Sequence, residues 1–300
     1  MKDIITVSVV NFKPVWGDIE ANLSRMLEYA AAAGKQGADL ILFPETAMTG
    51  YDDELSVERD EKMHRRLAQT IPGPASNAMS EICKKYNIYA LFGLTETDET
   101  DKSKVYNAAA ICGPEGVIGS YRKIHIPSFE SQWADPGDWP VMFDTPWGPM
   151  GIGICYDSYA FPEITRYCRA KGARLFLNLT AIASAESGGP GGYTGNLSLE
   201  YHAHNNSMYI ATSNLFGQDK RSWFMGGSSI IGPASRSPEI HYYAGKKFMD
   251  PGADQGTVET ATIDLSLTDL SFLAPVFTER KWRPADYIEW LRDVSCNKLL

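Results

Sequence analysis

Positive charge is scarce in this chain. Its 300 residues hold 28 Lys and Arg against 37 Asp and Glu, which gives a formal net charge of −9. The densest basic clusters, Lys84-Lys85 and Lys246-Lys247, are too short to form a basic stripe. A protein that binds nucleic acid needs such a stripe or face to neutralise phosphates. We therefore expect no nucleic acid among its partners.

Long apolar runs are missing too. No uninterrupted apolar segment approaches the roughly 18 residues that a membrane helix needs, and no basic-plus-apolar signal precedes the apolar segment 4–10. The five cysteines are an odd number without the spacing of a disulfide framework, which suits a reducing compartment. We expect a cytoplasmic protein with no membrane partner.

The chain also lacks the usual signatures of metal and phosphate sites. His202 and His204 point apart if they lie on a helix, and no third ligand with metal spacing is near them. The glycine-rich stretch 188–195 does not end in the Gly-Lys-Ser/Thr of a phosphate loop, so it is either a mobile lid over a pocket or a plain surface connection. We expect no metal and no cofactor.

What the chain does contain is a regular alternation of strand and helix patterns. Strand 4–10, helix 19–35 and strand 40–43 form a predicted βαβ unit, with Asp18 capping the helix. Gly113 to Gly116 is the predicted turn of a hairpin. Further helices are predicted at 58–70, 75–86, 161–171 and 197–206, and further strands at 88–95, 105–112, 117–122, 174–179, 208–213, 228–231 and 257–263.

No linker interrupts this order, so we predict a single α/β domain over residues 1–271. Such a domain buries one face of a sheet against helices and the other against a second sheet or layer. Residues 272–300 are less regular but rich in aromatic side chains. We predict that they form a C-terminal extension that docks on the body or on a partner subunit.

Cys155 is the most suggestive single residue. It ends the apolar strand Met150-Gly-Ile-Gly-Ile154 and is followed by a polar turn, where a substrate can reach a thiol. If the stretch 161–171 is a helix, its N-terminal N–H groups and macrodipole would lower the pKa of this thiol. We therefore interpret Cys155 as a nucleophile.

Two other reactive residues also follow strands. Glu45 comes after Leu40-Ile-Leu-Phe-Pro44, and Lys123 comes after Val117-Ile-Gly-Ser-Tyr-Arg122. Ligands of α/β sheets gather outside the carboxyl ends of strands, so a carboxylate, an ammonium group and a thiol are expected to meet in one pocket.

The order and spacing of these runs resemble a known signature. Phe43-Pro-Glu45, Tyr121-Arg-Lys123 and Gly153-Ile-Cys155 are similar to the Glu-Lys-Cys motifs of the nitrilase superfamily of carbon–nitrogen hydrolases. Glu130, six residues before Pro136-Gly-Asp138, resembles a second glutamate that many members carry. The resemblance implies a four-layer αββα sandwich of the carbon–nitrogen hydrolase type, commonly paired into homodimers or larger homo-oligomers.

The chemistry of these groups fits the resemblance. Glu45 would take the thiol proton and later activate water, provided that burial raises its pKa. Lys123 and the backbone N–H of Tyr156 would stabilise the oxyanion of the tetrahedral intermediate. Glu130 would orient Lys123 or the leaving nitrogen. The expected pocket walls, chosen because they are close in sequence to these turns, are Tyr51, Trp133, Tyr156, Tyr159 and Tyr193.

We therefore expect a thiol-dependent amidohydrolase that cleaves a small amide or carbamoyl compound through a thioester. A nitrilase is the first alternative, although nitrilases usually have Trp where Tyr156 stands. A binding or assembly protein that retains the fold is the second. Within the mechanism, His125 is a rival to Glu45 as the base.

The substrate itself is constrained only by exclusion. Relatives that bind a substrate carboxylate usually carry an arginine in the turn after the cysteine, and residues 156–160 contain none. This disfavours a substrate with a carboxylate. The acidic residues near Glu130 point weakly towards a neutral or amine-bearing compound.

Overall fold

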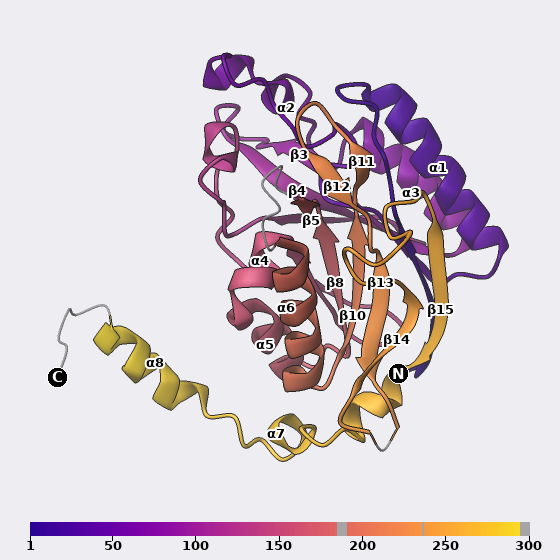
Figure 1. The fold of residues 1–300 in the computed structure, drawn as a ribbon, viewed down its shortest axis with the longest axis vertical. Helices are drawn as coiled ribbons and strands as arrows, with labels where there is room; N and C mark the ends of the chain where they lie inside the picture. Colours follow the sequence, from indigo (N-terminus) through magenta and orange to yellow (C-terminus); the bar gives the residue numbers. More distant parts are fainter. Residues whose placement is uncertain (185–190, 236, 295–300) are drawn as a thin grey trace.

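Two six-stranded sheets lie face to face at the centre of the molecule (Figure 1). The structure is a computed structural model that describes residues 1–184, 191–235 and 237–294, without the side chains of residues 184, 191–193, 290, 293 and 294. In spatial order, the first sheet consists of β15 (Val258–Asp264), β1 (Ile4–Val10), β2 (Leu40–Leu42), β3 (Tyr89–Thr97), β4 (Val105–Gly113) and β5 (Gly116–Arg122). The second consists of β14 (Ile240–Gly245), β13 (Ser229–Pro233), β10 (Tyr209–Asn214), β8 (Leu175–Thr180), β7 (Met150–Ile154) and β6 (Met142–Phe143).

Helices cover the outer face of each sheet. α1 (Ile19–Lys35) and α3 (Pro74–Tyr86) pack on the first sheet through a cluster that includes Met26, Met79 and Phe92. α5 (Pro162–Ala170) and α6 (Gly191–Asn206) pack on the second through a cluster that includes Leu199 and Phe176. The inner faces share the largest cluster, which contains Val7, Leu42, Ile152 and Leu177. These layers confirm the predicted αββα sandwich.

Most predicted elements lie within a few residues of the observed ones. β1 and β2 are parallel neighbours, as the βαβ prediction requires, and the Asp18 side chain accepts a hydrogen bond from the Ala21 N–H at the start of α1. β4 and β5 are antiparallel and meet at Gly113 and Gly116, so the predicted hairpin is confirmed.

The helix predicted at 58–70 is wrong. Only the short segments η1 (Arg59–Glu61) and α2 (Met63–Arg66) are helical, and Gln69 forms a β-bridge with Glu96. The reason is that this segment is fixed by polar contacts instead of one apolar face. Buried Lys62 and His64 bond to backbone carbonyls of the loop that follows Gly50.

A small third sheet was not predicted from the sequence. It consists of β11 (Phe216–Gln218), β12 (Trp223–Met225) and β9 (Ala183–Ser184), and its hairpin tip at residues 219–222 contacts the loop after Gly50. Strands of two or three residues carry too little periodicity to be recognised in a sequence.

The C-terminal segment leaves the sandwich at the bottom of the view in Figure 1 and extends outwards (yellow). It contains α7 (Pro275–Thr278) and α8 (Pro284–Val294), and Arg166 and Arg169 of α5 lie over the Phe277 ring. The domain boundary at residue 271, docking on a partner subunit and homo-oligomer formation stay predictions.

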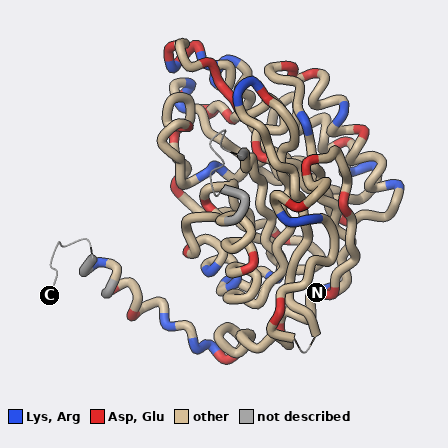
Figure 2. Tube along the Cα trace, in the orientation of Figure 1, with Lys and Arg blue, Asp and Glu red and all other residues tan. Residues whose placement is uncertain are grey.

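Charged residues of both signs are distributed over the whole molecule (Figure 2). In the view of Figure 2, Lys and Arg are scattered among Asp and Glu and do not gather in one patch. Among the described helices, none combines the length and apolar character needed to cross a bilayer.

Candidate active site

Glu45 lies in the turn that follows β2 and is completely buried. The turn is pressed against β3 at Gly93, whose N–H donates to the Pro44 carbonyl at 3.0 Å. A Cβ on Gly93 would lie 2.3 Å from the backbone nitrogen of Thr46 and 2.6 Å from the Cα of Glu45, so only glycine allows this approach. A glycine on a neighbouring strand thus sets the position of the glutamate.

Lys123 follows β5 and has no exposed surface. Its Nζ donates to Oε1 of Glu45 at 2.7 Å and to Oε1 of Glu130 at 2.6 Å. The turn at 136–138 fixes its backbone, because the Gly137 N–H donates to the Lys123 carbonyl at 2.7 Å. The structure therefore brings together the three charged residues that the sequence singled out.

Two neutral side chains complete this cluster. Asn107 of β4 donates through Nδ2 to Oε1 of Glu45 at 2.8 Å and to Oε2 of Glu130 at 3.1 Å. The Tyr51 hydroxyl donates to Oε1 of Glu130 at 2.7 Å. The second oxygen of Glu45, Oε2, is buried and has no hydrogen-bond partner within the described residues. Among the described residues, it is the free carboxylate acceptor of the cluster, beside the Oδ1 atom of Asn107, which also has no partner.

Burial and charge set the protonation of the cluster. Burial raises the pKa of Glu45 from 4.5 to about 7 against the opposing charge of Lys123. Burial alone would lower the pKa of Lys123, but the charges of Glu130 and Glu45 outweigh it and raise this pKa above its usual value. Near neutral pH, Lys123 is a fixed cation while Glu45 can exchange a proton.

Cys155 sits in a sharp turn between β7 and α4 (Tyr156–Ala160), with φ 49° and ψ −100°. Buried Asp157 holds this turn. Its Oδ2 accepts from the Ile154 N–H at 3.2 Å and from the Tyr121 hydroxyl at 2.7 Å, and its Oδ1 accepts from the His125 N–H at 2.9 Å. One carboxylate thus ties the turn at Cys155 to the segment that carries Lys123.

The expected low pKa of the Cys155 thiol is wrong. A helix does begin directly after Cys155, but burial, reinforced by the charge of Glu45, raises the pKa of the thiol above its usual value. Lys123, the Ala181 N–H and the Thr180 hydroxyl act in the opposite direction without prevailing. The resting sulfur is therefore a thiol that needs a base.

A cavity of about 490 Å³ opens beside Cys155. Four of the five expected pocket walls lie on it, namely Tyr51, Trp133, Tyr156 and Tyr159. The side chain of the fifth, Tyr193, lies outside the described part of the structure, as do residues 185–190 of the glycine-rich stretch. Residues 191–195 of that stretch form the first turns of α6.

His125, the rival to Glu45 as the base, contacts Asp157 and Phe161. The Nδ1 atom of His125 lies 2.8 Å from Oδ1 of Asp157, and its ring stacks on Phe161 with centroids 3.5 Å apart. Neither His125 nor Glu45 is among the residues that line the cavity, but the charge of Glu45 acts on the Cys155 thiol. Within the described residues no group of three His, Cys, Asp or Glu side chains is placed to hold a metal ion.

Several residues of the site gave no recognisable signal in the sequence. Asn107 lies inside an apolar strand, and Thr180 ends another and accepts a hydrogen bond from the Tyr159 hydroxyl at 3.0 Å. Asp157 lies in the polar turn after Cys155, where a carboxylate is an ordinary surface residue. A polar residue inside a buried strand is the one cue that would have identified Asn107 and Thr180.

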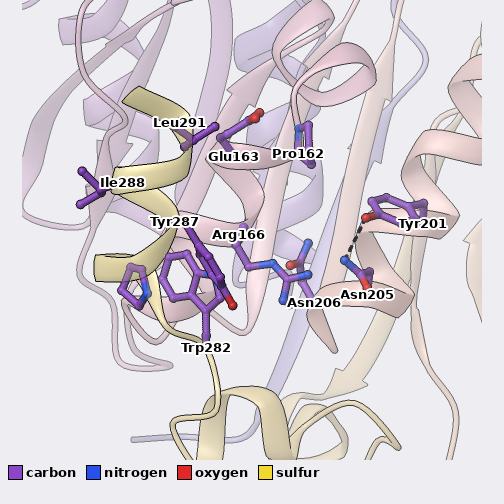
Figure 3. A pocket seen from close by; sticks show the side chains of 11 residues that line it. Pro162, Glu163, Arg166, Tyr201, Asn205, Asn206, Trp282, Tyr287, Ile288 and Leu291 are labelled. Atoms are coloured by element: carbon purple, nitrogen blue, oxygen red, sulfur yellow. Dashed lines mark hydrogen bonds between the residues drawn. The ribbon is translucent and has the colours of Figure 1, made fainter. Parts of the chain in front are cut away.

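A second cavity of about 410 Å³ lies between α5, α6 and the C-terminal segment. Figure 3 shows Trp282, Tyr287 and Leu291 on one side of it, facing Arg166 of α5 and Tyr201 of α6. It shares no lining residue with the cavity at Cys155.

Known proteins resemble this chain over most of its length. The family model described as carbon-nitrogen hydrolase matches residues 6–268. A nitrilase of Pyrococcus abyssi is 30% identical over 77% of this chain and 82% of its own length, and the omega-amidase NIT2 of Homo sapiens is 29% identical over 87% and 89%. The crystal structure of an amidase from Nesterenkonia sp. superposes with a TM-score of 0.74 at 22% identity, covering 97% of both chains. A variant of that amidase shows Michael addition of acrylamide at its active-site cysteine.

Proposed function

This chain belongs to the carbon–nitrogen hydrolase family and is an amidase-like hydrolase of carbon–nitrogen bonds other than peptide bonds, and we propose that it cleaves a small amide or carbamoyl compound through a thioester on Cys155. The observation that carries this proposal is the free Oε2 of Glu45. That atom belongs to a buried carboxylate with a pKa of about 7, in a cluster whose charges act on the Cys155 sulfur.

The first half of the reaction forms the thioester. The Cys155 sulfur attacks the substrate carbonyl carbon while its proton passes to Glu45. The carbonyl oxygen becomes an oxyanion, which the Lys123 ammonium group and the Tyr156 N–H stabilise. When the intermediate collapses, the carbon–nitrogen bond breaks, and the leaving nitrogen takes the proton from Glu45 and departs as ammonia or an amine.

The second half returns the enzyme to its resting state. A water molecule attacks the thioester carbon and gives a proton to Glu45. Collapse of the second intermediate breaks the carbon–sulfur bond, and the sulfur recovers a proton from Glu45 as the acid leaves. Glu130 acts through Lys123, because its Oε1 accepts a hydrogen bond from Nζ at 2.6 Å and keeps the ammonium group in place.

The test is an ammonia-release screen with aliphatic amides, carbamoyl amines and nitriles. We expect Cys155→Ala to lose activity by at least about a thousandfold, because the covalent route disappears. Intact mass should show an acyl adduct on the wild type and none on the variant. Cys83→Ala is the matched control, since Cys83 is buried in α3 away from the cavity. Undiminished turnover in Cys155→Ala would refute the mechanism.

The same screen addresses the alternatives. Hydrolysis of nitriles without hydrolysis of amides would identify a nitrilase instead. Tyr156, which stands where nitrilases usually have Trp, and the likeness to omega-amidases and amidases support the amide reaction.

A further inference from the structure

Three charged side chains line the cavity beside Cys155: Asp52, Asp53 and Arg221. The two aspartates lie in the loop after Gly50, and the arginine lies at the tip of the β11–β12 hairpin. How these three charges are paired decides what charge the cavity presents to a substrate.

Asp52 is fully engaged. Its Oδ1 accepts from the Ser222 hydroxyl at 2.7 Å, and its Oδ2 accepts from the backbone N–H groups of Arg221 and Ser222 at 2.5 Å and 2.7 Å. The guanidinium of Arg221 forms an ion pair with Asp52 at 3.8 Å and donates to the Asp53 carbonyl at 3.1 Å. The charges of Asp52 and Arg221 therefore largely offset each other.

Asp53 is left over. Its Oδ1 accepts from the N–H groups of Glu54 at 2.7 Å and Met63 at 3.2 Å, but its Oδ2 is buried and has no hydrogen-bond partner within the described residues. Within the same residues, its carboxylate forms no ion pair. Asp53 also lines the cavity, so its carboxylate is the charged group there that is left without a counter-charge among the described residues and is able to take a cationic ligand.

The nearest rival explanation is Lys62. This lysine is buried, but its Nζ donates to the backbone carbonyl of Glu54 and forms no ion pair among the described residues. Lys62 therefore does not satisfy Oδ2 of Asp53.

We propose that the substrate carries an ammonium group, which binds Asp53 while its amide lies at Cys155. The inference rests on the proposed function, since it places the scissile bond at that sulfur. Leu55, Phe129 and Tyr156 line the same cavity with well-exposed apolar surface, which suits an alkyl chain between the two ends. The substrate class is therefore an ω-amino amide or its carbamoyl analogue.

The experiment compares isosteric substrates of increasing chain length. Each ω-amino amide is paired with the alkanamide in which a methyl group replaces the ammonium group, and with the monoamide that carries a carboxylate at the same end. The measured quantity is the ratio of kcat/KM for the ω-amino amide to that for the alkanamide. We expect a ratio well above one at the best length, and a fall of about tenfold to a hundredfold in this ratio in Asp53→Asn, because a charged hydrogen bond is lost.

Glu54→Gln is the matched control. It removes the same charge from the neighbouring residue, which pairs with Lys220 and does not line the cavity. We expect it to change the ratio by less than about threefold, since exposed charges are screened.

Binding to Cys155→Ala, measured by calorimetry, gives the same comparison without turnover. If no substrate is hydrolysed but the ω-amino amide binds more tightly than the alkanamide, the proposed function fails, and only the ammonium-binding site at Asp53 is supported. A wild-type ratio at or below one, or a preference for the carboxylate monoamide, overturns the inference while leaving amide hydrolysis intact. An equal loss on both substrates in Asp53→Asn, together with a lower Tm, would assign Asp53 to balancing Lys62 and also overturn it.

Discussion

Arg122 and Lys123 are neighbours at the end of β5, and each contacts two carboxylates, yet they form two very different sites. Lys123 is completely buried with Glu45 and Glu130. Arg122 lies on the opposite side of the strand, partly exposed, and pairs with Glu96 at 2.5 Å and with Asp98 at 2.8 Å. The alternation of side chains along a strand sends one cation into the sandwich and the other to the surface.

The two sites differ in the direction in which the pKa of a carboxylate is shifted. At the surface, hydrogen bonds from Thr100, from the backbone around it and from Arg122 lower the pKa of Asp98 below its usual range. In the interior, burial outweighs Lys123 and raises the pKa of Glu45 to about 7. Two cations with two carboxylate contacts each thus have neighbours with opposite behaviour. Hydrogen bonds keep Asp98 ionised at the surface, whereas burial allows Glu45 to exchange a proton.

Within this comparison, the largest effect is expected from removing Lys123. Lys123→Ala should lower kcat/KM by about 10²–10³-fold, the usual cost of losing an oxyanion donor. It should also destabilise the fold by about 3–5 kcal/mol, because two buried carboxylates lose their counter-charge. Steady-state kinetics and denaturant unfolding measure the two effects.

Arg122→Ala is the paired control. Its activity should stay within about threefold of the wild type, because its guanidinium bonds to Glu96 and Asp98 and not to the cluster around Lys123. Its stability should fall by about 1–3 kcal/mol, because buried Glu96 loses a charged hydrogen-bond partner. Equal activity losses in the two variants would contradict the distinction between the sites.

The pH dependence sharpens the comparison. Glu45 must be ionised to act as a base, so kcat/KM should fall about tenfold for each pH unit below about 7. The pKa of Glu45 is higher in the folded than in the unfolded state, so its protonated form contributes stability that is present below pH 4.5 and is lost as pH rises through about 7.

Two variants that replace a carboxylate with an amide test the direction of this pH dependence of stability. The unfolding free energy of Glu45→Gln relative to the wild type should increase as pH rises from 4.5 to about 7. Asp98 has a lowered pKa, so its stabilisation is present above its usual pKa and is lost as pH falls. Asp98→Asn should therefore approach wild-type stability at acid pH. Parallel curves for the two variants would contradict the assigned directions.

The smallest expected effect concerns Thr180, whose hydroxyl contacts the Cys155 sulfur. Thr180→Val keeps the shape of the side chain and removes a hydrogen bond, so kcat should fall about two- to tenfold. The alkaline limb of iodoacetamide labelling should move to higher pH, because the thiolate loses a stabilising contact. Thr180→Ser should restore both, and a variant with full activity and unchanged labelling would exclude this contact from the site.

The sequence was sufficient to predict the layers and the charged residues of the site. Strong periodicity identified α1 and most central strands, and the strand-end positions of Glu45, Lys123 and Cys155 pointed to one pocket. Contacts between segments that are far apart in the chain could not be predicted from the sequence. Gly93 carries no local cue that it fits the turn at Glu45, and the pairing of Asp52 with the hairpin tip depends on loops far apart in the chain. The absence of arginine from residues 156–160 disfavours a substrate carboxylate, which stays a prediction, and Arg221 lines the cavity from another element.

Cys155 holds its sulfur in place with a backbone conformation that only glycine adopts freely, at φ 49°. Residues other than glycine in such regions cost about 1–3 kcal/mol, a sizeable share of the net stability of a folded domain. The clamp of Asp157 on the turn maintains this conformation. The strain therefore lies at the residue that we propose as the nucleophile, and the hydrogen bonds of Asp157 hold the turn that bears it.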